Sequence, residues 1–416
     1  MHDDHRKRLR QAMAEPRPYP DAAFAGRGIV ICAGGERLLT CAWVLIRMLQ
    51  DALGCTLPIE VWHLGPREIG APMAALLEEV GVTLVDAEAV RRDHPVRRLG
   101  GWELKPYAIL YSRFEEVLLI DADNVPVVDP VFLFDCPEYR EAGAVFWPDV
   151  VKLAPDNPVW EACGLEYRDE PSFESGQVLV DKRRCWAALD LTMYFNAYSD
   201  VYYELVHGDK DTFYLAWRLL DQPFAMPGAV KRLTATMCQH DFDGRRIFQH
   251  RNQAKWILRG RNREIEGFVH EDKCRTYLAD LRRLWDGRIF HPPDRSAAAT
   301  AIEAALVAQR WFRCVLVSAG ESPVELLSGH RLSRFAQEAI VWHVADGTDG
   351  VELMLIEDGR EMACLRQDSD GVWRGRQLVR EHIPMELHPM APDDRPAASN
   401  SRYPRLADLG TAYERL

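Results

Sequence analysis

Two aspartates, Asp121 and Asp123, stand two residues apart directly after the apolar run Val117–Ile120. A continuous apolar run of this length indicates a strand buried on both faces. Carboxylates at the end of such a strand are costly to bury unless a cation neutralises them. Their oxygens suit Mg²⁺ or Mn²⁺, which proteins usually hold through one or two carboxylates together with substrate phosphates. Asp121-Ala122-Asp123 is therefore a predicted metal and diphosphate site; the alternative is an acidic turn that caps backbone amides.

A second candidate segment, FQHRNQAKW at residues 248–256, supplies an imidazole and an ammonium five residues apart. If this loop folds over the end of the sheet, His250 becomes the third metal ligand and Lys255 reaches a phosphate of the diphosphate. His240 and His270 are the competing candidates for the imidazole ligand. Together the two segments predict a clamp for a nucleoside diphosphate and its metal ion.

The elements that position these residues alternate between strands and helices. Tyr107, Leu110, Tyr111 and Phe114 recur at helical spacing, which predicts a helix directly before the strand that carries the aspartates. The alternation predicts an α/β fold with a parallel sheet wound in the Rossmann manner, whose ligands collect at the carboxyl ends of the strands. The predicted strands are Gly28–Cys32, Ile59–Leu64, Val82–Val85, Val117–Ile120, Gly143–Trp147 and Gln177–Val180, and further helices are Glu36–Leu53, Pro72–Val80, Arg184–Val206 and Thr212–Leu220.

The character of the chain changes near residue 291, where HPPDRSAAAT has the composition of a linker. Beyond it, Asp-Gly pairs at residues 346–347, 349–350, 358–359 and 370–371 are typical hairpin signals. We therefore expect a polar leader over residues 1–26, a nucleotide-binding domain over 27–290, a linker over 291–300, a small β-rich domain over 301–392 and a tail over 393–416.

Composition excludes several classes of protein. A formal net charge of −12 over 416 residues argues against a nucleic-acid binder, which would normally carry a basic face. No stretch approaches the roughly 18 apolar residues of a membrane helix, and the charged N-terminus lacks the apolar core of a signal peptide. Ten cysteines without any CxxC pair favour buried free thiols. We expect a cytoplasmic protein with no integral membrane segment.

Five blocks of the sequence carry a family resemblance. They are KPYAILYSRFEEVLLIDADNVPVVDP, GAVFWPDV, ESGQVLVDK, HGDKDTF and FQHRNQAKW. In this order, over about Gly28–Arg259, they resemble α-mannosyltransferases of the fungal Golgi type. The chain is more distantly similar to glycogenin-like retaining transferases, whose His-x-x-Gly-x-x-Lys element is similar to His250–Lys255 with one residue fewer. The resemblance implies a GT-A glycosyltransferase domain that binds a nucleotide sugar.

The resemblance also implies roles for individual residues. Small residues after the first strand would let the backbone approach the nucleotide base and ribose, and other side chains would reach the donor sugar or its phosphates. Glu174 stands where related enzymes have Asn, and Lys210 where they have Gln. Asp209 would hydrogen-bond the donor sugar near its anomeric carbon, although it also suits a helix N-cap. The implied donor-binding residues are Ala33, Gly34, Gly35, Lys105, Asp121, Ala122, Asp149, Ser175, Gly176, Gln177 and Lys255.

The predicted function is transfer of a hexose, mannose being favoured, from a nucleotide-diphosphate donor to an acceptor hydroxyl. Mn²⁺ or Mg²⁺ held by Asp121, Asp123 and His250 would stabilise the charge of the leaving diphosphate. The resemblance implies retention of configuration, with Asp209 and Glu174 as candidate catalytic carboxylates. The donor is GDP-mannose or a UDP-hexose, the acceptor is a glycan, lipid-linked sugar or small molecule, and a homo-oligomer is possible. The alternatives are a haloacid-dehalogenase-like phosphohydrolase, whose signature VLLIDADNV superficially fits, and a non-catalytic nucleotide-sugar or glycan-binding protein.

Overall fold

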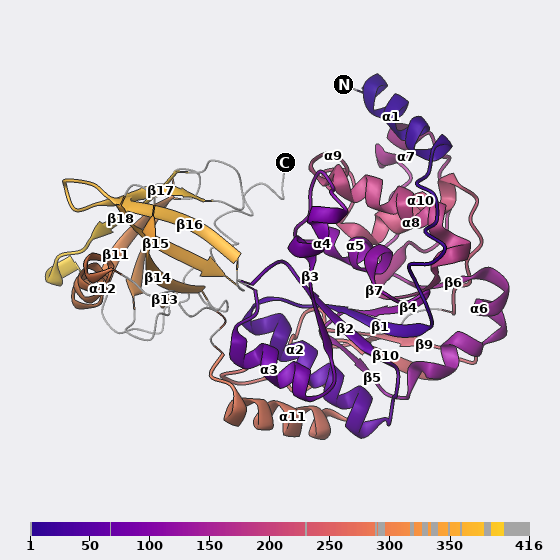
Figure 1. The fold of residues 1–416 in the computed structure, drawn as a ribbon, viewed down its shortest axis with the longest axis horizontal. Coiled ribbons are helices and arrows are strands. Elements are labelled where there is room, and N and C mark those ends of the chain that lie inside the picture. The colour runs from indigo at the N-terminus through magenta and orange to yellow at the C-terminus, as the bar shows by residue number, and fades with distance from the viewer. Residues whose placement is uncertain are drawn as a thin grey trace. The chain divides into compact units, whose positions relative to one another are not determined.

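A computed structural model of the protein describes residues 2–66, 68–228, 231–287, 289, 296–316, 320–326, 332–333, 340–347, 350–357, 360–377 and 384–394. The chain divides into two compact units, Met1–Gly287 and Arg288–Leu416, whose ribbons are drawn in Figure 1. All candidate site residues lie in the first unit. The predicted tail from residue 395 onward and the first half of the predicted linker, residues 291–295, lie outside the described residues.

The first unit is built on a six-stranded sheet with the strand order β3-β2-β1-β4-β7-β6. Strands β1, β2, β3 and β4 run parallel, as predicted, because helices connect them. Strand β7 is antiparallel to both of its neighbours, which the sequence did not predict. A strand that is buried on both faces has the same apolar pattern in either direction. The strands are β1 (Arg27–Cys32), β2 (Ile59–His63), β3 (Thr83–Asp86), β4 (Glu116–Ile120), β6 (Ala144–Pro148) and β7 (Phe173–Asp181).

Helices cover both faces of this sheet, as Figure 1 shows. Helices α5, α8 and α10 pack together on one face, and α2 and α11 pack together on the other. The α/β class is therefore as predicted. The helices of this unit are α1 (His2–Ala14), α2 (Gly35–Arg47), α3 (Ala71–Glu79), α4 (Ala87–Asp93), α5 (Leu104–Tyr111), α6 (Pro137–Ala142), α7 (Val159–Cys163), α8 (Lys182–Ala197), α9 (Ser199–Tyr202), α10 (Asp209–Leu219) and α11 (Glu271–Leu284).

Three short helical segments complete the unit: the π-helical turn η1 (Met48–Ala52) and the 3₁₀ turns η2 (Gly101–Glu103) and η3 (Pro130–Asp135). The helix predicted from Glu36 to Leu53 is thus α2 continued by η1. Residues 2–14, expected as part of a polar leader, instead form α1, which packs on α7 and α8 and buries Leu9. The burial of this apolar side chain anchors a helix whose composition is otherwise polar.

A second, antiparallel sheet in this unit has the order β5-β10-β9-β8. Its strands are β5 (Asn124–Pro126), β8 (Lys231–Leu233), β9 (Thr236–His240) and β10 (Arg246–His250). Strand β5 starts directly after the two aspartates, and its register with β10 places His250 opposite Asn124. This pairing brings a segment that is distant in the sequence to the end of β4.

The second unit is an eight-stranded antiparallel sheet in the order β13-β12-β11-β18-β17-β16-β15-β14. The predicted small β-rich region is confirmed, and the Asp-Gly pair at residues 346–347 lies in the β14–β15 hairpin, where Gly347 pairs with Gly350. Trp342 and Trp373 are buried in its core. Its elements are α12 (Ala297–Gln309), β11 (Trp311–Leu316), β12 (Gly320–Leu326), β13 (Leu332–Ser333), β14 (Ile340–Gly347), β15 (Gly350–Glu357), β16 (Arg360–Gln367), β17 (Trp373–Gln377), β18 (Pro384–Pro389) and η4 (Pro392–Asp394).

Residues 297–300, expected in the linker, form the start of α12, whose first turn Ser296 caps by accepting a hydrogen bond from the Ala299 amide. Two of the hairpin signals, at residues 349 and 358–359, fall outside the described residues. In the part of the chain that is described, none of the helices has the length and apolar character needed to cross a bilayer.

Candidate active site

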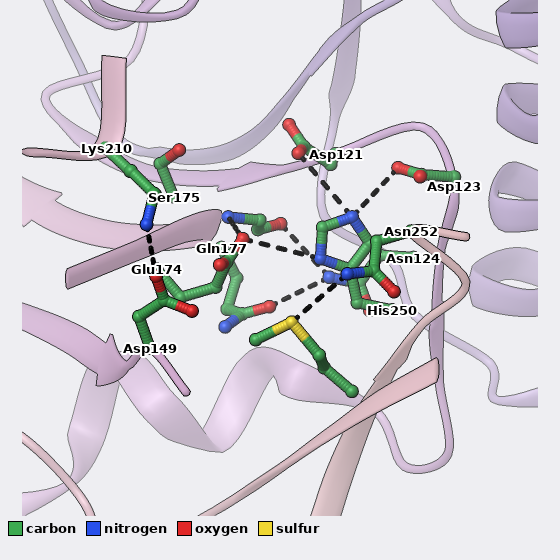
Figure 2. A network of polar contacts seen from close by, with 12 residues as sticks. Asp121, Asp123, Asn124, Asp149, Glu174, Ser175, Gln177, Lys210, His250 and Asn252 are labelled. Atoms are coloured by element: carbon green, nitrogen blue, oxygen red, sulfur yellow. Dashed lines mark hydrogen bonds and ion pairs between the residues drawn. The ribbon is translucent and has the colours of Figure 1, made fainter. Parts of the chain in front are cut away.

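The turn after β4 is held in place by β7. The Asp121 amide donates to the carbonyl of Gly176 at 2.8 Å, and the Asn124 amide donates back to the Asp121 carbonyl at 2.9 Å. The Asn124 side chain donates to Gln177 Oε1 at 2.8 Å and to the Gly176 carbonyl at 3.1 Å. These bonds fold residues 121–124 into a tight turn, with the two carboxylates at the end of the strand (Figure 2).

Strand β10 adds the imidazole that the sequence predicted. His250 Nε2 lies 3.2 Å from Asp123 Oδ1 and 3.8 Å from Asp121 Oδ2. One ligand atom from each of these three residues falls within 4.8 Å of the others, and among the described residues this is the one such group of three or more acidic, histidine or cysteine side chains. His240 and His270 lie elsewhere, His240 at the end of β9 and His270 before α11.

The donor set of this cluster suits a divalent cation. Two carboxylates and an imidazole nitrogen are oxygen and nitrogen ligands of the kind that Mn²⁺ accepts. Asp123 is only 2% exposed. Burial disfavours its carboxylate, but the adjacent His250 and Lys255 outweigh burial and hold the pKa of Asp123 well below its usual range. The residues present therefore fit the predicted metal ion.

Two lysines complete the charge balance of the cluster. Lys105, at the start of α5, places its ammonium 2.9 Å from Asp121 Oδ2 and 3.2 Å from the Ser175 hydroxyl. Lys255 pairs with Asp123 Oδ2. Burial lowers the pKa of each lysine, but the neighbouring carboxylates outweigh it, so both pKa values are raised and both lysines carry a positive charge. Each of the two aspartates predicted to bind the metal therefore pairs with one lysine, Asp121 with Lys105 and Asp123 with Lys255.

Glu174, predicted as a candidate catalytic carboxylate, faces His250 instead of open space. Its Oε1 accepts a hydrogen bond from the Gly176 amide at 3.0 Å and lies 3.5 Å from His250 Nδ1 (Figure 2). A side chain at position 176 would clash with the imidazole, because a Cβ there would lie 2.5 Å from His250 Nδ1. Glycine at this position leaves that space to the ring. A carboxylate behind a ligand histidine fixes the ring and leaves its other nitrogen for the metal. This geometry favours an orienting role for Glu174.

Replacing Glu174 by glutamine is expected to weaken Mn²⁺ binding by about 10- to 100-fold, because the ring of His250 loses its charged partner. The measurement is a Mn²⁺ titration followed by electron paramagnetic resonance of the free ion. Glu161→Gln, which makes the same chemical change in an 88% exposed side chain on α7, is the matched control and should bind Mn²⁺ normally. Normal Mn²⁺ affinity in Glu174→Gln with a severe loss of turnover would instead assign Glu174 to the anomeric carbon.

Asp209 also lies beside Lys105. Its Oδ2 is 3.6 Å from the Lys105 ammonium and has no hydrogen-bond partner among the described residues. Burial raises the pKa of Asp209 to about 6, and Lys105 opposes that shift. Asp209 is the first residue of α10 and follows Gly208, whose φ of 73° and ψ of −152° are accessible essentially only to glycine. A buried carboxylate with an unused acceptor beside a cation is suited to interact with a ligand.

The remaining predicted donor residues fall into two groups. Asp149, at the end of β6, pairs with Lys210 and accepts a hydrogen bond from the Val150 amide at 2.6 Å (Figure 2). Ser175 touches Lys105, as described above. Gln177 and Ala122, in contrast, are buried: Gln177 is fully buried against Asn124, and Ala122 is 3% exposed. Gln177 supports the turn through its bond to Asn124.

The small residues predicted to contact the nucleotide follow β1. Ala33 and Gly34 connect β1 to α2, whose first residue is Gly35, and Ala33 is 2% exposed. A Cβ at Gly34 would meet the carboxylate of Glu68 at 2.3 Å, and Gly35 has a φ of 80°. Glycine at both positions is therefore required for this close approach. The nucleotide contacts of these residues stay a prediction.

One residue that sequence reasoning missed is Arg251, which is completely buried. Its guanidinium stacks over Trp256 at 3.7 Å and donates to the carbonyls of Ala254 and Arg263 at 2.7 and 2.8 Å. Its own amide donates to the Asp123 carbonyl at 3.0 Å. Arg251 therefore folds the loop that returns Lys255 to the cluster. An arginine inside an otherwise polar loop gives no signal of burial in the sequence.

Replacing Arg251 by lysine is expected to lower the free energy of unfolding by about 2–3 kcal/mol, because an ammonium cannot reproduce the planar stacking or the separate hydrogen bonds. Urea unfolding monitored by circular dichroism measures the change. Arg259→Lys, on an exposed part of the same loop, is the matched control and is expected to change stability little. An unchanged midpoint for Arg251→Lys would show that the buried guanidinium does not organise the loop.

The sequence of the chain matches a known protein family. The family model described as "Mannosyltransferase putative" matches residues 26–159 and 165–243, just over half of the chain. Similar curated proteins include the alpha-1,2-mannosyltransferase MNN24 of Candida albicans, 30% identical over 36% of this chain and 27% of that protein. Another is the alpha-1,2-mannosyltransferase MNN5 of Saccharomyces cerevisiae, 23% identical over 56% of this chain and 50% of that protein. The chain spans between about a quarter and a half of the length of these relatives.

Solved structures with a detectable likeness include two glycosyltransferases. The bifunctional glycosyltransferase WbbM is 13% identical, with 50% of this chain and 39% of that chain covered and a TM-score of 0.37. The mannosyltransferase Ktr4p of S. cerevisiae, solved in complex with GDP, is 12% identical, with 53% and 77% covered and a TM-score of 0.34. The extent of the family match establishes that the chain belongs to the putative mannosyltransferase family.

Proposed function

We propose that this chain transfers mannose from a nucleoside-diphosphate donor, GDP-mannose in the first instance, to an acceptor hydroxyl with retention of configuration. The observation that carries the proposal is the convergence of Asp121, Asp123 and His250 with Lys105 and Lys255 at the carboxyl end of β4. In an open α/β sheet this end of the strands is the usual place for a ligand. The family of the chain supports mannose as the sugar.

Asp121, Asp123 and His250 would hold Mn²⁺ or Mg²⁺. When bound, the ion supplies Lewis-acid stabilisation of the negative charge that develops on the leaving diphosphate. The protein's part is to fix the ligands in advance: β7 holds the turn of Asp121, and Glu174 holds His250. Preorganised ligands need no rearrangement as the reaction proceeds.

Lys105 and Lys255 have a second task when the donor is present. Each now neutralises one aspartate of the cluster. With the aspartates engaged by the ion that they would hold, both ammonium groups would be able to pair with phosphate oxygens, which would keep the charges in the site balanced. The lysines thereby act on the diphosphate from two sides, since one comes from α5 and the other from the loop after β10.

Asp209 is the carboxylate that we place near the anomeric carbon. As the bond between the sugar and the diphosphate breaks, positive charge develops on that carbon, and a carboxylate within reach stabilises it. Asp209 has an acceptor oxygen without a partner among the described residues, whereas the Glu174 carboxylate is directed at His250 and Gly176. Of the two candidate carboxylates, this contrast favours Asp209.

A diphosphate clamp does not identify the base, so a UDP-hexose is the second donor to test. The phosphohydrolase alternative gains no support: its catalytic aspartate belongs on the first strand of the domain, whereas β4 follows three other strands. The test is release of GDP from GDP-mannose, measured with and without Mn²⁺ in the presence of a mannose disaccharide. Mn²⁺-dependent release with formation of a trisaccharide supports the proposal. Release of inorganic phosphate instead would contradict it.

A further inference from the structure

An exposed aromatic side chain lies at the edge of the candidate active site. Trp102 is 51% exposed, and it is the one tryptophan among the large apolar side chains that are exposed in the described part of the chain. It belongs to η2, the turn that leads directly into α5 and so to Lys105. Leaving an indole half in water has a cost that burial in the core would have avoided. About half of the residue is therefore available to a ligand.

The orientation of the indole is fixed by its neighbours. Its ring centroid is 6.1 Å from that of Tyr203 and 5.7 Å from that of His207. The ring also lies against Gly208, where an added Cβ would meet Trp102 Cε3 at 2.6 Å. Gly208 immediately precedes Asp209, the carboxylate that we place near the anomeric carbon. Trp102 is thus a partly exposed aromatic plate next to the residue that precedes Asp209.

A cavity of about 310 Å³ begins next to this plate. His207 contacts Trp102 and also lines the cavity. The walls carry polar groups of both kinds, acceptors such as Ser172 and Asp211 and donors such as Lys210. Asp211 is only 2% exposed, and its Oδ1 has no hydrogen-bond partner among the described residues. A buried acceptor without a partner in a cavity wall is a place for a ligand hydroxyl.

The first turn of α10 joins this cavity to the donor side. Asp209 lies near Lys105, whereas Lys210, which pairs with Asp149, and Asp211 both line the cavity. A molecule in the cavity therefore lies against the two residues that directly follow Asp209.

We infer that Trp102 and this cavity form the acceptor subsite and that the acceptor is a neutral sugar chain. This inference rests on the proposed function and extends it to the acceptor class. A pyranose ring has an apolar face that stacks on an indole and hydroxyl groups that both donate and accept hydrogen bonds. A cavity with walls of mixed sign suits such hydroxyl groups. A lipid tail would require a continuous apolar groove, and the cavity walls carry charged and polar groups.

The test uses two neutral disaccharides, an α-linked mannobiose and maltose, with the full chain saturated with GDP and Mn²⁺. Isothermal titration calorimetry measures their affinity for the wild type, Trp102→Ala and Val151→Arg. Val151 is 58% exposed and lines the cavity, so a long charged side chain there blocks it without disturbing the core. Leu284→Ala, at a 55% exposed position on α11, is the control for removal of an exposed apolar side chain.

We expect at least one disaccharide to bind the wild type and Leu284→Ala equally, and both cavity variants to weaken its binding by about tenfold or more. The thermal shift caused by GDP with Mn²⁺ is recorded on the same samples. A normal nucleotide shift with sugar binding that is absent, or unaffected by either variant, would overturn the acceptor subsite alone. No nucleotide shift in the wild type would contradict the proposed function and, with it, the acceptor subsite that rests on it.

Discussion

Replacement of Asp123 by asparagine is expected to reduce sugar transfer by roughly a thousandfold or more and to remove the Mn²⁺ dependence of nucleotide binding. Asp123 is the most central residue of the cluster, because His250 and Lys255 both contact its carboxylate. Asparagine keeps the shape of the side chain but removes its charge, so His250 and Lys255 lose the carboxylate that both contact. Neither a metal ion nor the loop of Lys255 is then held in place.

Isothermal titration with GDP, in the presence of Mn²⁺ or of a chelator, measures this effect directly. Asp243→Asn, in the exposed turn between β9 and β10, is the matched control and should bind GDP as the wild type does. Melting of both variants by circular dichroism checks that they are folded. Binding of GDP by Asp123→Asn with unchanged affinity and unchanged metal dependence would remove Asp123 from the metal site.

Asp209→Asn is expected to lower the turnover number on the order of a thousandfold while leaving the affinity for GDP and Mn²⁺ almost unchanged. The reason is that Asp209 touches Lys105 but is not among the three predicted metal ligands. Loss of this carboxylate is therefore expected to destabilise the transition state at the sugar without weakening the binding of the diphosphate. Glu174→Gln should give the opposite pattern, with weakened metal binding.

The pH dependence gives a second readout for Asp209, whose pKa burial raises from 3.8 to about 6. Transfer requires the ionised carboxylate, so kcat/KM is expected to fall as the pH decreases through about 6.

The ionisation of Asp209 has the opposite effect on the stability of the protein. A carboxyl group whose pKa is raised by folding stabilises the protein at low pH, and this contribution is lost as the pH rises from the unfolded pKa to the folded one. Without ligand at pH 7.5, Asp209→Asn should therefore melt at the same temperature as the wild type or higher. A markedly lower melting temperature would indicate a structural role for the carboxylate.

Those parts of the site that depend on local pattern could be predicted from the sequence. The apolar run ending at Ile120 indicates a buried strand, and two carboxylates at its end would be costly without a cation to neutralise them. Segment 248–256 is predicted to return to them because an imidazole and an ammonium at that spacing complete a diphosphate clamp. The β-rich character of the second unit follows from turn chemistry at its Asp-Gly pairs.

The parts that depend on distant contacts could not be predicted. The register of β10 on β5 aligns His250 with Asn124, and no local feature of either segment fixes that register. The apolar pattern of β7 likewise does not show in which direction the strand runs. That direction places the Gly176 carbonyl where it accepts a hydrogen bond from the Asp121 amide. Glu174 looks like any acidic residue until its distance to His250 is known. Local propensity specifies elements, and tertiary pairing specifies which side chains meet.

The most direct test of the central claim is a thermal-shift screen of the wild-type chain with GDP-mannose, a UDP-hexose, an ADP-sugar and a dTDP-sugar, each with and without Mn²⁺. A ligand that binds only the folded state raises the melting temperature. We predict that GDP-mannose raises it by several degrees when Mn²⁺ is present and by little in a chelator. A shift of equal size without any metal, or no shift with any of the four nucleotide sugars, would contradict a metal-dependent diphosphate clamp at Asp121, Asp123 and His250.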